Sequence, residues 1–267
     1  MRVPLERAIR EIVRASVESF AASFKARHIE EIDNPEGVIN KKIHNVFVAA
    51  LGEEIQYYSA LVRSFDSSLG NTLESMAMSI ARLQFTVKKR VVGKLYQKQI
   101  TIIASLLEKY KRREELPDIQ HYRLLRDIEI DSNEAIKRHD SDYHLIDEYT
   151  NKHYLIELKI GGDLDSKKAR SEKEALFEQY AILANSVDSD TPIYCFFATA
   201  YNRYGEGSEW NQTRVLQFFS RDELLIGRNF WNFVAKTDEG YDIVLDEYRK
   251  SSFVIQEALE DIKEEYL

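Results

Sequence analysis

The tripeptide Glu157-Leu158-Lys159 carries the clearest chemical potential in this sequence. Side chains two positions apart on a β-strand project from the same face, so Glu157 and Lys159 point the same way. A carboxylate can hold a divalent metal ion while a nearby ammonium group orients or polarises an attacking water. Asp142 lies fifteen residues earlier and could add a second carboxylate from a paired strand. Hard oxygen ligands of this kind suit Mg²⁺.

An acidic residue two positions before a lysine also arises by chance. The sequence contains three such pairs, Glu157/Lys159, Asp165/Lys167 and Asp261/Lys263. The second is expected at a junction between a loop and a helix, and the third on a polar helix near the end of the chain. The first lies on a strand whose opposite face is apolar, and a rigid strand holds reactive groups in place. The alternative interpretation of the first pair is a cross-strand ion pair without a catalytic role.

The elements around this tripeptide are expected to form a helix-flanked sheet. Residues 143–148 and 153–160 predict a β-hairpin with its turn at 150–152, and the second strand alternates apolar and mixed faces. Residues 167–186 have the apolar stripe of an amphipathic helix. The continuous apolar run 192–200 is typical of a buried central strand.

The remainder of the C-terminal half predicts a strand and two helices. A strand is expected around 215–219. The sequence Ser220-Arg221-Asp222-Glu223 has the spacing of a capping box and predicts the start of a helix that ends near Val234. An acidic helix is expected to finish the chain.

The first 115 or so residues are expected to be helical. An apolar stripe at helical spacing comprises Leu5, Ile9, Ile12, Val13, Val17 and Phe20. A second helical stretch is predicted over 38–62, a polar break over 64–71, and a further helix from Thr72 through a basic segment. We therefore predict an α/β (α+β) protein with a helix-rich region over 1–116 and an α/β core with a mixed central sheet over 117–267.

Composition restricts the class of protein. The 267 residues include 37 Lys and Arg, 45 Asp and Glu, and one cysteine, Cys195, so the formal net charge is -8. A single cysteine excludes a disulfide framework and a multi-cysteine zinc site. No apolar stretch approaches the roughly 18–20 residues that span a bilayer, and the first residues lack the apolar core of a signal peptide. We expect a soluble cytoplasmic protein without membrane contact.

The charges are unevenly distributed. Residues 1–125 hold 20 basic and 15 acidic residues, whereas residues 126–267 hold 17 and 30. Ten basic residues and one acidic residue fall within 82–113. Such a segment indicates either contact with a polyanion or a solvated helix face, because affinity for phosphates depends on local charge.

The order of these motifs resembles the core of PD-(D/E)xK nucleases, and in particular type II restriction endonucleases. Asp142 on one strand and Glu157-Leu158-Lys159 on the next carry the resemblance. Three further stretches are similar to sequences in such enzymes: 67–74, with serines and glycine before Glu74; the charged helix start 167–174; and 224–231, with Gly227 before Phe230 and Trp231. The resemblance covers about 64–235 and extends to the group that cuts GGNCC-type sites.

The resemblance implies a role for each matching residue. Asp142 and Glu157 would be metal ligands, joined by the carbonyl of Leu158. Lys159 would assist the nucleophilic water, and Glu74 would be a helix-borne acid that reaches the site. The proline that precedes the first aspartate in this family is replaced by Ser141, which leaves Asp140 as an alternative to Asp142.

The implied reaction is Mg²⁺-dependent, sequence-specific hydrolysis of phosphodiester bonds in double-stranded DNA at a short palindromic site. Candidate DNA contacts are Lys167, Lys168 and Arg170 on the charged helix and Asn202, Arg203 and Arg214 in the polar loop after the buried strand. Arginine pairs bidentately with guanine and often provides specificity. A palindrome matches a twofold dimer, so we expect a homodimer. The alternatives are a repair nuclease or junction resolvase on the same core, and a DNA-binding module without catalysis.

Overall fold

A computed structural model describes residues 3–126, 128 and 134–267, and in the strand that begins at Glu134 it describes side chains from Tyr143 onward. The chain divides into two compact units. A helical unit comprises residues up to 80 together with 242–267, and a sheet unit comprises residues 81–241. This division differs from the one expected at Pro117, since residues 81–116 belong with the sheet and the last helix belongs with the first.

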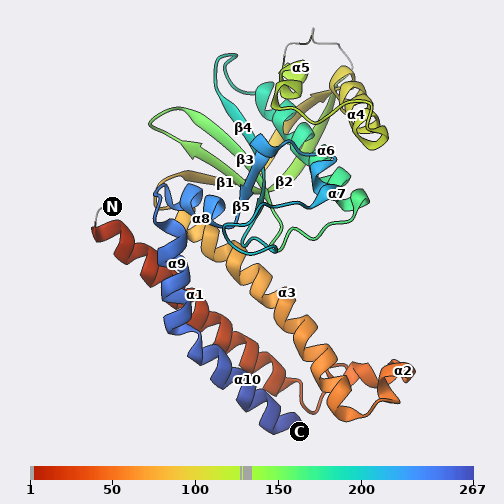
Figure 1. Cartoon of the computed structure of the whole chain (residues 1–267), viewed down its shortest axis with the longest axis vertical. Helices are drawn as coiled ribbons and strands as arrows, with labels where there is room; N and C mark the ends of the chain where they lie inside the picture. Colours follow the sequence, from red (N-terminus) through yellow and green to blue (C-terminus); the bar gives the residue numbers. More distant parts are fainter. Residues whose placement is uncertain (1–2, 127, 129–133) are drawn as a thin grey trace. The chain divides into compact units, whose positions relative to one another are not determined.

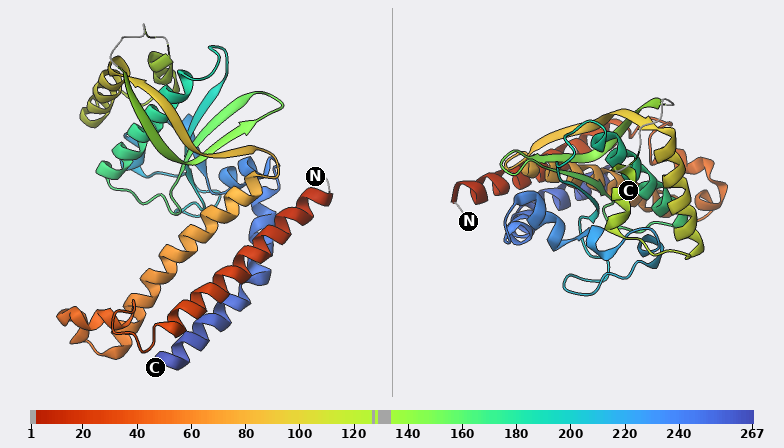
Figure 2. Two further views of the ribbon diagram at one scale, coloured as in Figure 1. Left: turned by 180° about the vertical axis from the view of Figure 1, so that it is seen from behind. Right: turned by 90° about the horizontal axis from the view of Figure 1, so that it is seen from above.

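Long helices build the helical unit (Figure 1). They are α1 (Val3–Glu30), α3 (Glu53–Ala81), the C-terminal part of α9 (Gly240–Ser251) and α10 (Phe253–Tyr266), with the short η1 (Asn40–His44) and α2 (Val46–Ala49) before α3. The view from behind also shows α1 and α10 side by side (Figure 2). Ile9, Val13, Val17 and Phe20 of the predicted stripe are buried, so the prediction of this helix is confirmed.

The predicted break over 64–71 is wrong, because α3 runs through it without interruption. Phe65 packs against Phe20 and Phe24 of α1, with ring centroids 5.5 and 5.7 Å apart. The packing of this partly buried aromatic side chain against α1 outweighs the weak helix propensity of the serines and glycine around it. The helix predicted over 38–62 is also interrupted, since η1 and α2 are short and α3 begins at Glu53.

The sheet unit contains a five-stranded mixed sheet in the order β1-β2-β3-β4-β5. The strands are β1 (Thr86–Tyr96), β2 (Glu134–Asp147), β3 (Lys152–Leu158), β4 (Ile193–Thr199) and β5 (Leu224–Ile226). The first three are antiparallel neighbours, and the last three are parallel. The α6 helix (Ser166–Ala184) connects the parallel pair β3 and β4, as parallel strands require a crossover. The expected α/β fold with a helix-flanked mixed sheet is confirmed.

The helix predicted through the basic segment is wrong over β1. Val91 and Leu95 are buried, whereas Lys88, Lys89 and Arg90 are exposed on this edge strand. The long partner β2 supplies backbone hydrogen bonds along the strand. Basic side chains on an edge strand also hinder pairing with further strands. The α4 helix (Gln97–Arg112) follows directly.

The hairpin, the amphipathic helix and the central strand are confirmed as β2–β3, α6 and β4. The strand predicted around 215–219 is wrong, because residues 213–216 form the short helix α7 (Thr213–Leu216). The capping box at Ser220 and Glu223 is present but starts one 3-10 turn, η3 (Arg221–Glu223). The strand β5 and Gly227, with a positive φ of 51°, then separate this turn from α8 (Arg228–Ala235).

Helices cover both faces of the sheet. On one face, α4 and α6 enclose the core, to which β3 and β4 contribute Leu155, Cys195 and Phe197. On the other face, Phe233 of α8 packs against Tyr154 and Phe196. Two short helices, η2 (Ile119–Tyr122) and α5 (Arg123–Arg126), pack on the α6 side. None of the helices in the described part of the chain has the length and apolar character to cross a membrane.

Candidate active site

Glu157 and Lys159 lie at the carboxyl end of β3, where this strand runs parallel to β4 (Figure 1). Glu157 pairs with Phe197 and Leu158 with Ala198 in the register of the two strands. Sheets of this kind bind ligands outside the carboxyl ends of their parallel strands. The tripeptide therefore lies at the edge of the sheet where a substrate can bind.

The structure brings Glu157 and Lys159 together and adds a third charged group. The Nζ atom of Lys159 lies 3.7 Å from Oε2 of Glu157 and 3.2 Å from Oε2 of Glu172 on α6. Glu157 is 5% exposed, and the Lys159 side chain is 30% exposed. One ammonium group thus lies between two carboxylates and remains accessible to solvent.

A buried amide holds the carboxylate of Glu157. The Nε2 atom of Gln179 donates a hydrogen bond to Oε1 of Glu157 over 2.8 Å. Gln179 is fully buried in α6. Because α6 packs on the face of β3 that carries Glu157, this contact fixes one carboxylate oxygen and leaves the other toward Lys159. Gln179 and Glu172 were not predicted as site residues, although both follow Lys168 on the predicted helix.

Asp142 and its alternative Asp140 lie in β2, but their side chains are outside those that the structure describes. The position of Asp142 along the backbone is one residue before Tyr143, whose partner on β3 is Ile156. Leu158 is a buried residue at the end of β3. The ligand roles of Asp142 and of the Leu158 carbonyl stay predictions.

The turn after β3 and the loop after β4 contact each other through charged and polar side chains. Arg203, in the loop after β4, forms an ion pair with Asp163, in the turn after β3, at 2.5 Å. Gln212 donates to the same carboxylate over 3.2 Å. The hydrogen bond from Arg203 lowers the pKa of Asp163. The Asn202 side chain stabilises its own loop, because its Nδ2 atom donates a hydrogen bond to the carbonyl oxygen of Ser208 over 2.7 Å.

The other candidate DNA contacts lie at the start of α6 and in α7. Lys167 and Lys168 are exposed in the first turn of α6, and Arg214 is exposed in α7. Arg170 is half-buried and forms an ion pair with Glu108 of α4 at 2.8 Å. In protein–DNA complexes, lysine and arginine side chains commonly contact the phosphates. The roles of these four residues in DNA binding stay predictions.

A match to a known protein family covers nearly the whole chain. The model of the HinfI type II restriction endonuclease family matches residues 5–252. The chain belongs to this family. The expectation of a type II restriction endonuclease family is confirmed, and membership implies a site-specific nuclease that binds DNA. Comparisons with curated proteins and with solved structures give no match.

A divalent metal ion is typical of restriction endonucleases. No group of three or more His, Cys, Asp or Glu side chains among them is arranged to hold a metal ion. Glu157 and Glu172 provide hard oxygen donors on either side of Lys159, which fits Mg²⁺ in chemical type. A complete ligand set would need a further carboxylate, and the β2 position of Asp142 is the candidate.

Glu74 lies within α3 of the helical unit, where it is half-buried. The stretch 67–74 is therefore the interior of a long helix and not a helix start, which corrects that part of the expectation. The sheet unit carries Glu157 and Lys159. The role of Glu74 at the site stays a prediction.

A buried ion pair beneath the sheet escaped sequence analysis. Lys173 of α6 and Glu223 are both fully buried and contact each other, and the Tyr122 hydroxyl donates to Glu223 over 2.9 Å. Burial lowers the pKa of Lys173, while Glu223 opposes that shift. The signal was available, since Lys173 lies between Ala169 and Leu176 on the apolar stripe of the predicted helix.

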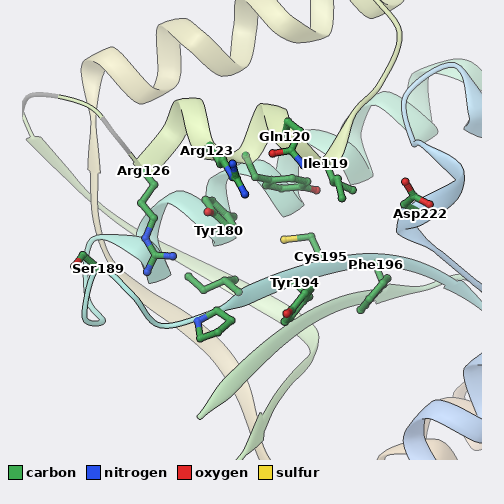
Figure 3. A pocket seen from close by; sticks show the side chains of 13 residues that line it. Ile119, Gln120, Arg123, Arg126, Tyr180, Ser189, Tyr194, Cys195, Phe196 and Asp222 are labelled. Carbon is green, nitrogen blue, oxygen red and sulfur yellow. The ribbon is translucent and has the colours of Figure 1, made fainter. Parts of the chain in front are cut away.

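The sheet unit holds a cavity of about 630 Å³ (Figure 3), and Glu157, Leu158 and Lys159 are not among the residues that line it. It is lined by Arg123 and Arg126 of α5, by Tyr180 of α6 and by residues 192–196. Those residues of β4 precede Phe197 and Ala198, which pair with Glu157 and Leu158. Burial raises the pKa of the Cys195 thiol that faces this cavity, so the thiol is kept protonated.

Proposed function

We propose that this chain is a Mg²⁺-dependent type II restriction endonuclease that hydrolyses both strands of DNA at a short palindromic site as a homodimer. Family membership supports the nuclease class. The observation that carries the finer proposal is the cluster of Glu157, Lys159 and Glu172 at the carboxyl end of β3. Two carboxylates and an ammonium on rigid elements suit metal-assisted hydrolysis of a phosphodiester.

In the proposed mechanism each residue of the cluster has a separate task. Lys159 holds and orients the attacking water and reduces the negative charge that a phosphate meets near two carboxylates. Gln179 keeps Glu157 in one orientation through Oε1, so that its second oxygen, Oε2, lies toward Lys159. A Mg²⁺ ion held by Glu157, Asp142 and the Leu158 carbonyl would neutralise the phosphate oxygens and the departing 3′-oxygen. Lys167, Lys168, Arg203 and Arg214 would contact the duplex on either side.

Cleavage of a sequenced plasmid by the purified chain tests this proposal. We expect discrete bands in Mg²⁺ and loss of cleavage in excess EDTA, with recovery when Mg²⁺ is restored. Smeared products or nicking confined to branched DNA would instead indicate a repair nuclease or resolvase. Undiminished turnover under chelation would contradict the metal role. Synthetic duplexes with and without a GGNCC-type site then test the expected recognition sequence.

Variants separate catalysis from binding. Glu157→Ala and Lys159→Ala should each lower the cleavage rate by 100-fold or more, on the order of 3 kcal/mol of transition-state stabilisation, while DNA affinity changes little. The matched control is Glu174→Ala, an exposed carboxylate on the same α6 helix, which should cleave as wild type. Equal cleavage by wild type and Glu157→Ala would remove the proposed mechanism.

A further inference from the structure

The cavity between α5, α6 and β4 has the dimensions of a small-molecule site (Figure 3). Its volume of about 630 Å³ falls within the roughly 300–1,000 Å³ of pockets that hold small ligands. Every residue that lines it belongs to the sheet unit. The proposed nuclease chemistry uses none of these residues, so the cavity is available for another ligand.

The inner surface of the cavity is aromatic and apolar. Tyr122, Tyr180 and Cys195 line it and are almost fully buried. The ring centroids of Tyr122 and Tyr180 lie 4.9 Å apart. The Tyr122 hydroxyl donates a hydrogen bond to the buried carboxylate of Glu223 over 2.9 Å, which fixes this ring. Aromatic side chains held in this way offer a surface on which a planar ring packs.

Two arginines three positions apart in α5 bring positive charge to the cavity. Arg123 is exposed and Arg126 is half-buried. The Nη1 and Nη2 atoms of Arg126 donate to the carbonyl oxygens of Thr191 and Asp188 over 2.8 and 2.9 Å, and its Nε atom is buried without a partner. Among the residues that the structure describes, no carboxylate pairs with either arginine.

This pair of guanidinium groups favours an anionic ligand. The carbonyl oxygens that hold Arg126 fix its position but carry no full negative charge. Guanidinium groups match the geometry of phosphate and bind it through parallel hydrogen bonds. Attraction between opposite charges is also stronger at a half-buried group than in bulk water. A phosphate group is therefore the ligand chemistry that suits this end of the cavity.

Asp222 gives the cavity a second polar end. Figure 3 shows Asp222 and Arg126 at opposite ends, with Tyr180 and Cys195 between them. Asp222 is exposed in η3. Carboxylates accept hydrogen bonds from the amino groups of bases such as cytosine. The order of cation, aromatic surface and carboxylate matches the order of phosphate, ring and amino group in a nucleotide.

We propose that this cavity binds a nucleoside 5′-monophosphate, with its phosphate on Arg123 and Arg126, its base against Tyr180 and an amino group of the base toward Asp222. The site is separate from the cluster at β3, and the evidence for it is independent of the proposed function. The same chemical groups are offered by a free nucleotide and by the 5′-phosphate end of a DNA strand.

Calorimetric titration of the DNA-free protein with dCMP in EDTA tests the site. We expect wild type to bind one dCMP per chain. Arg123→Gln should lower the affinity by about tenfold or more, because it removes a charge-assisted contact. The matched control is Arg112→Gln, which removes an exposed arginine of α4 and should bind as wild type. A wild type that does not bind dCMP, or equal affinity in Arg123→Gln, would overturn the proposal.

A second pair of nucleotides tests the orientation of the base. The base of dUMP carries an oxygen where that of dCMP carries the amino group, so dCMP should bind more tightly. Asp222→Ala should abolish this preference while both nucleotides still bind. A preference for dCMP that persists in Asp222→Ala would contradict the contact with Asp222.

Maleimide labelling locates the bound nucleotide without any change at the arginines. Cys195 is buried and is the single cysteine of the chain, so an added exposed cysteine reports its own surroundings. Saturating dCMP should slow the labelling of Ser189→Cys, at the edge of the cavity, by several-fold. Ser208→Cys, exposed outside the cavity, should react at an unchanged rate. No protection of Ser189→Cys would place bound dCMP elsewhere and refute the assignment.

Competition distinguishes the two sources of the nucleotide. Displacement of dCMP by a short oligodeoxycytidine strand with a 5′-phosphate, but not with a 5′-hydroxyl, would identify a DNA end as the ligand. Displacement by neither strand would identify the free nucleotide. Equal displacement by both strands would contradict recognition of a 5′-monophosphate. Because no cleavage is measured, failure of the proposed nuclease activity would leave these results unaffected.

Discussion

At the scale of single residues, burial decides what each lysine of α6 and β3 does. Lys159 is partly exposed between Glu157 and Glu172, where it can meet a phosphate. Lys173 is fully buried against Glu223 and Tyr122, and it lies in the core that supports α6. We therefore propose a catalytic role for Lys159, whereas Lys173 contributes to the stability of the fold.

Removal of one partner of the buried pair should cost far more than removal of an exposed one. Lys173→Met leaves the Glu223 carboxylate buried without its cation, so we expect a loss of about 3–5 kcal/mol in the free energy of unfolding. Arg221→Ala breaks an exposed ion pair with Glu209 and should cost less than about 1 kcal/mol. Urea unfolding measures both. Similar losses in the two variants would contradict the distinction.

His144 should make stability depend on pH. Burial, with His153 close by at 3.0 Å, lowers the pKa of His144 to about 4 from 6.5. As pH falls, His144 is protonated in the unfolded chain at a higher pH than in the folded chain. The stability that neutral His144 contributes to the folded state is therefore complete above about pH 6.5 and is lost as pH falls toward 4. In wild type the free energy of unfolding should therefore fall as pH falls from 6.5 to 4. His144→Gln should reduce the slope of this dependence by up to about 1.4 kcal/mol per pH unit. Exposed His44→Gln is the control, and urea unfolding at pH 7 and 4.5 measures the slope. An equal slope in His144→Gln and wild type would refute the assignment.

At the scale of elements, α6 links the core to the candidate site. Its N-cap Asp165 accepts from Lys168 N over 2.8 Å. Its middle supplies Glu172 and Gln179 to the cluster at β3. The turn between β3 and α6 must therefore hold one geometry, and Gly162 is the residue that permits it.

Substitution of Gly162 should disturb both stability and cleavage. Gly162 has a φ of +63°, and an added Cβ would lie 2.7 Å from the Thr199 methyl. Gly207 has a φ of +86° with no atom within 4 Å of such a Cβ, so Gly207→Ala carries backbone strain alone, about 1–2 kcal/mol. Gly162→Ala should cost at least about 1 kcal/mol more and slow cleavage. Thermal unfolding and plasmid cleavage compare the two. Equal behaviour would show that the turn tolerates a side chain.

At the scale of the whole molecule, an acidic protein must bind a polyanion. The formal net charge of -8 opposes DNA in general, so binding depends on local basic groups and on any bound metal ion. The exposed Lys167 and Lys168 at the start of α6 are the candidates nearest in sequence to the proposed catalytic cluster of Glu157, Lys159 and Glu172. A dimer would double their number along one duplex.

The salt dependence of DNA affinity measures these contacts. Lys167→Gln/Lys168→Gln should weaken binding at all sequences and reduce the slope of log affinity against log salt by about 2 per chain, since each phosphate contact contributes about 0.9. Lys250→Gln, which removes an exposed lysine paired with Asp246 on α9, should leave the slope unchanged. A slope unaffected by the first variant would remove these lysines from the interface.

Local sequence patterns were sufficient to predict an element where one physical signal, such as apolar periodicity, dominated. Period-two alternation located β3 and placed Glu157 and Lys159 on one face, because strand geometry fixes side-chain direction. The apolar stripes located α1 and α6, because helix geometry places residues three and four positions apart on the same face. The motif order likewise indicated the restriction endonuclease family, which the family match confirms.

Tertiary contacts decided the rest. The strand β1 forms because β2 offers partners along its length. The α3 helix continues through a polar stretch because Phe65 packs against Phe20 and Phe24 of α1. The strand β5 interrupts an expected helix beside β4. The positions of Gln179 and Glu172 beside the tripeptide depend on how α6 packs on the sheet. Sequence thus determined the chemical groups and the local periods, whereas long-range pairing and burial, whose energies exceed local propensity, decided which groups meet.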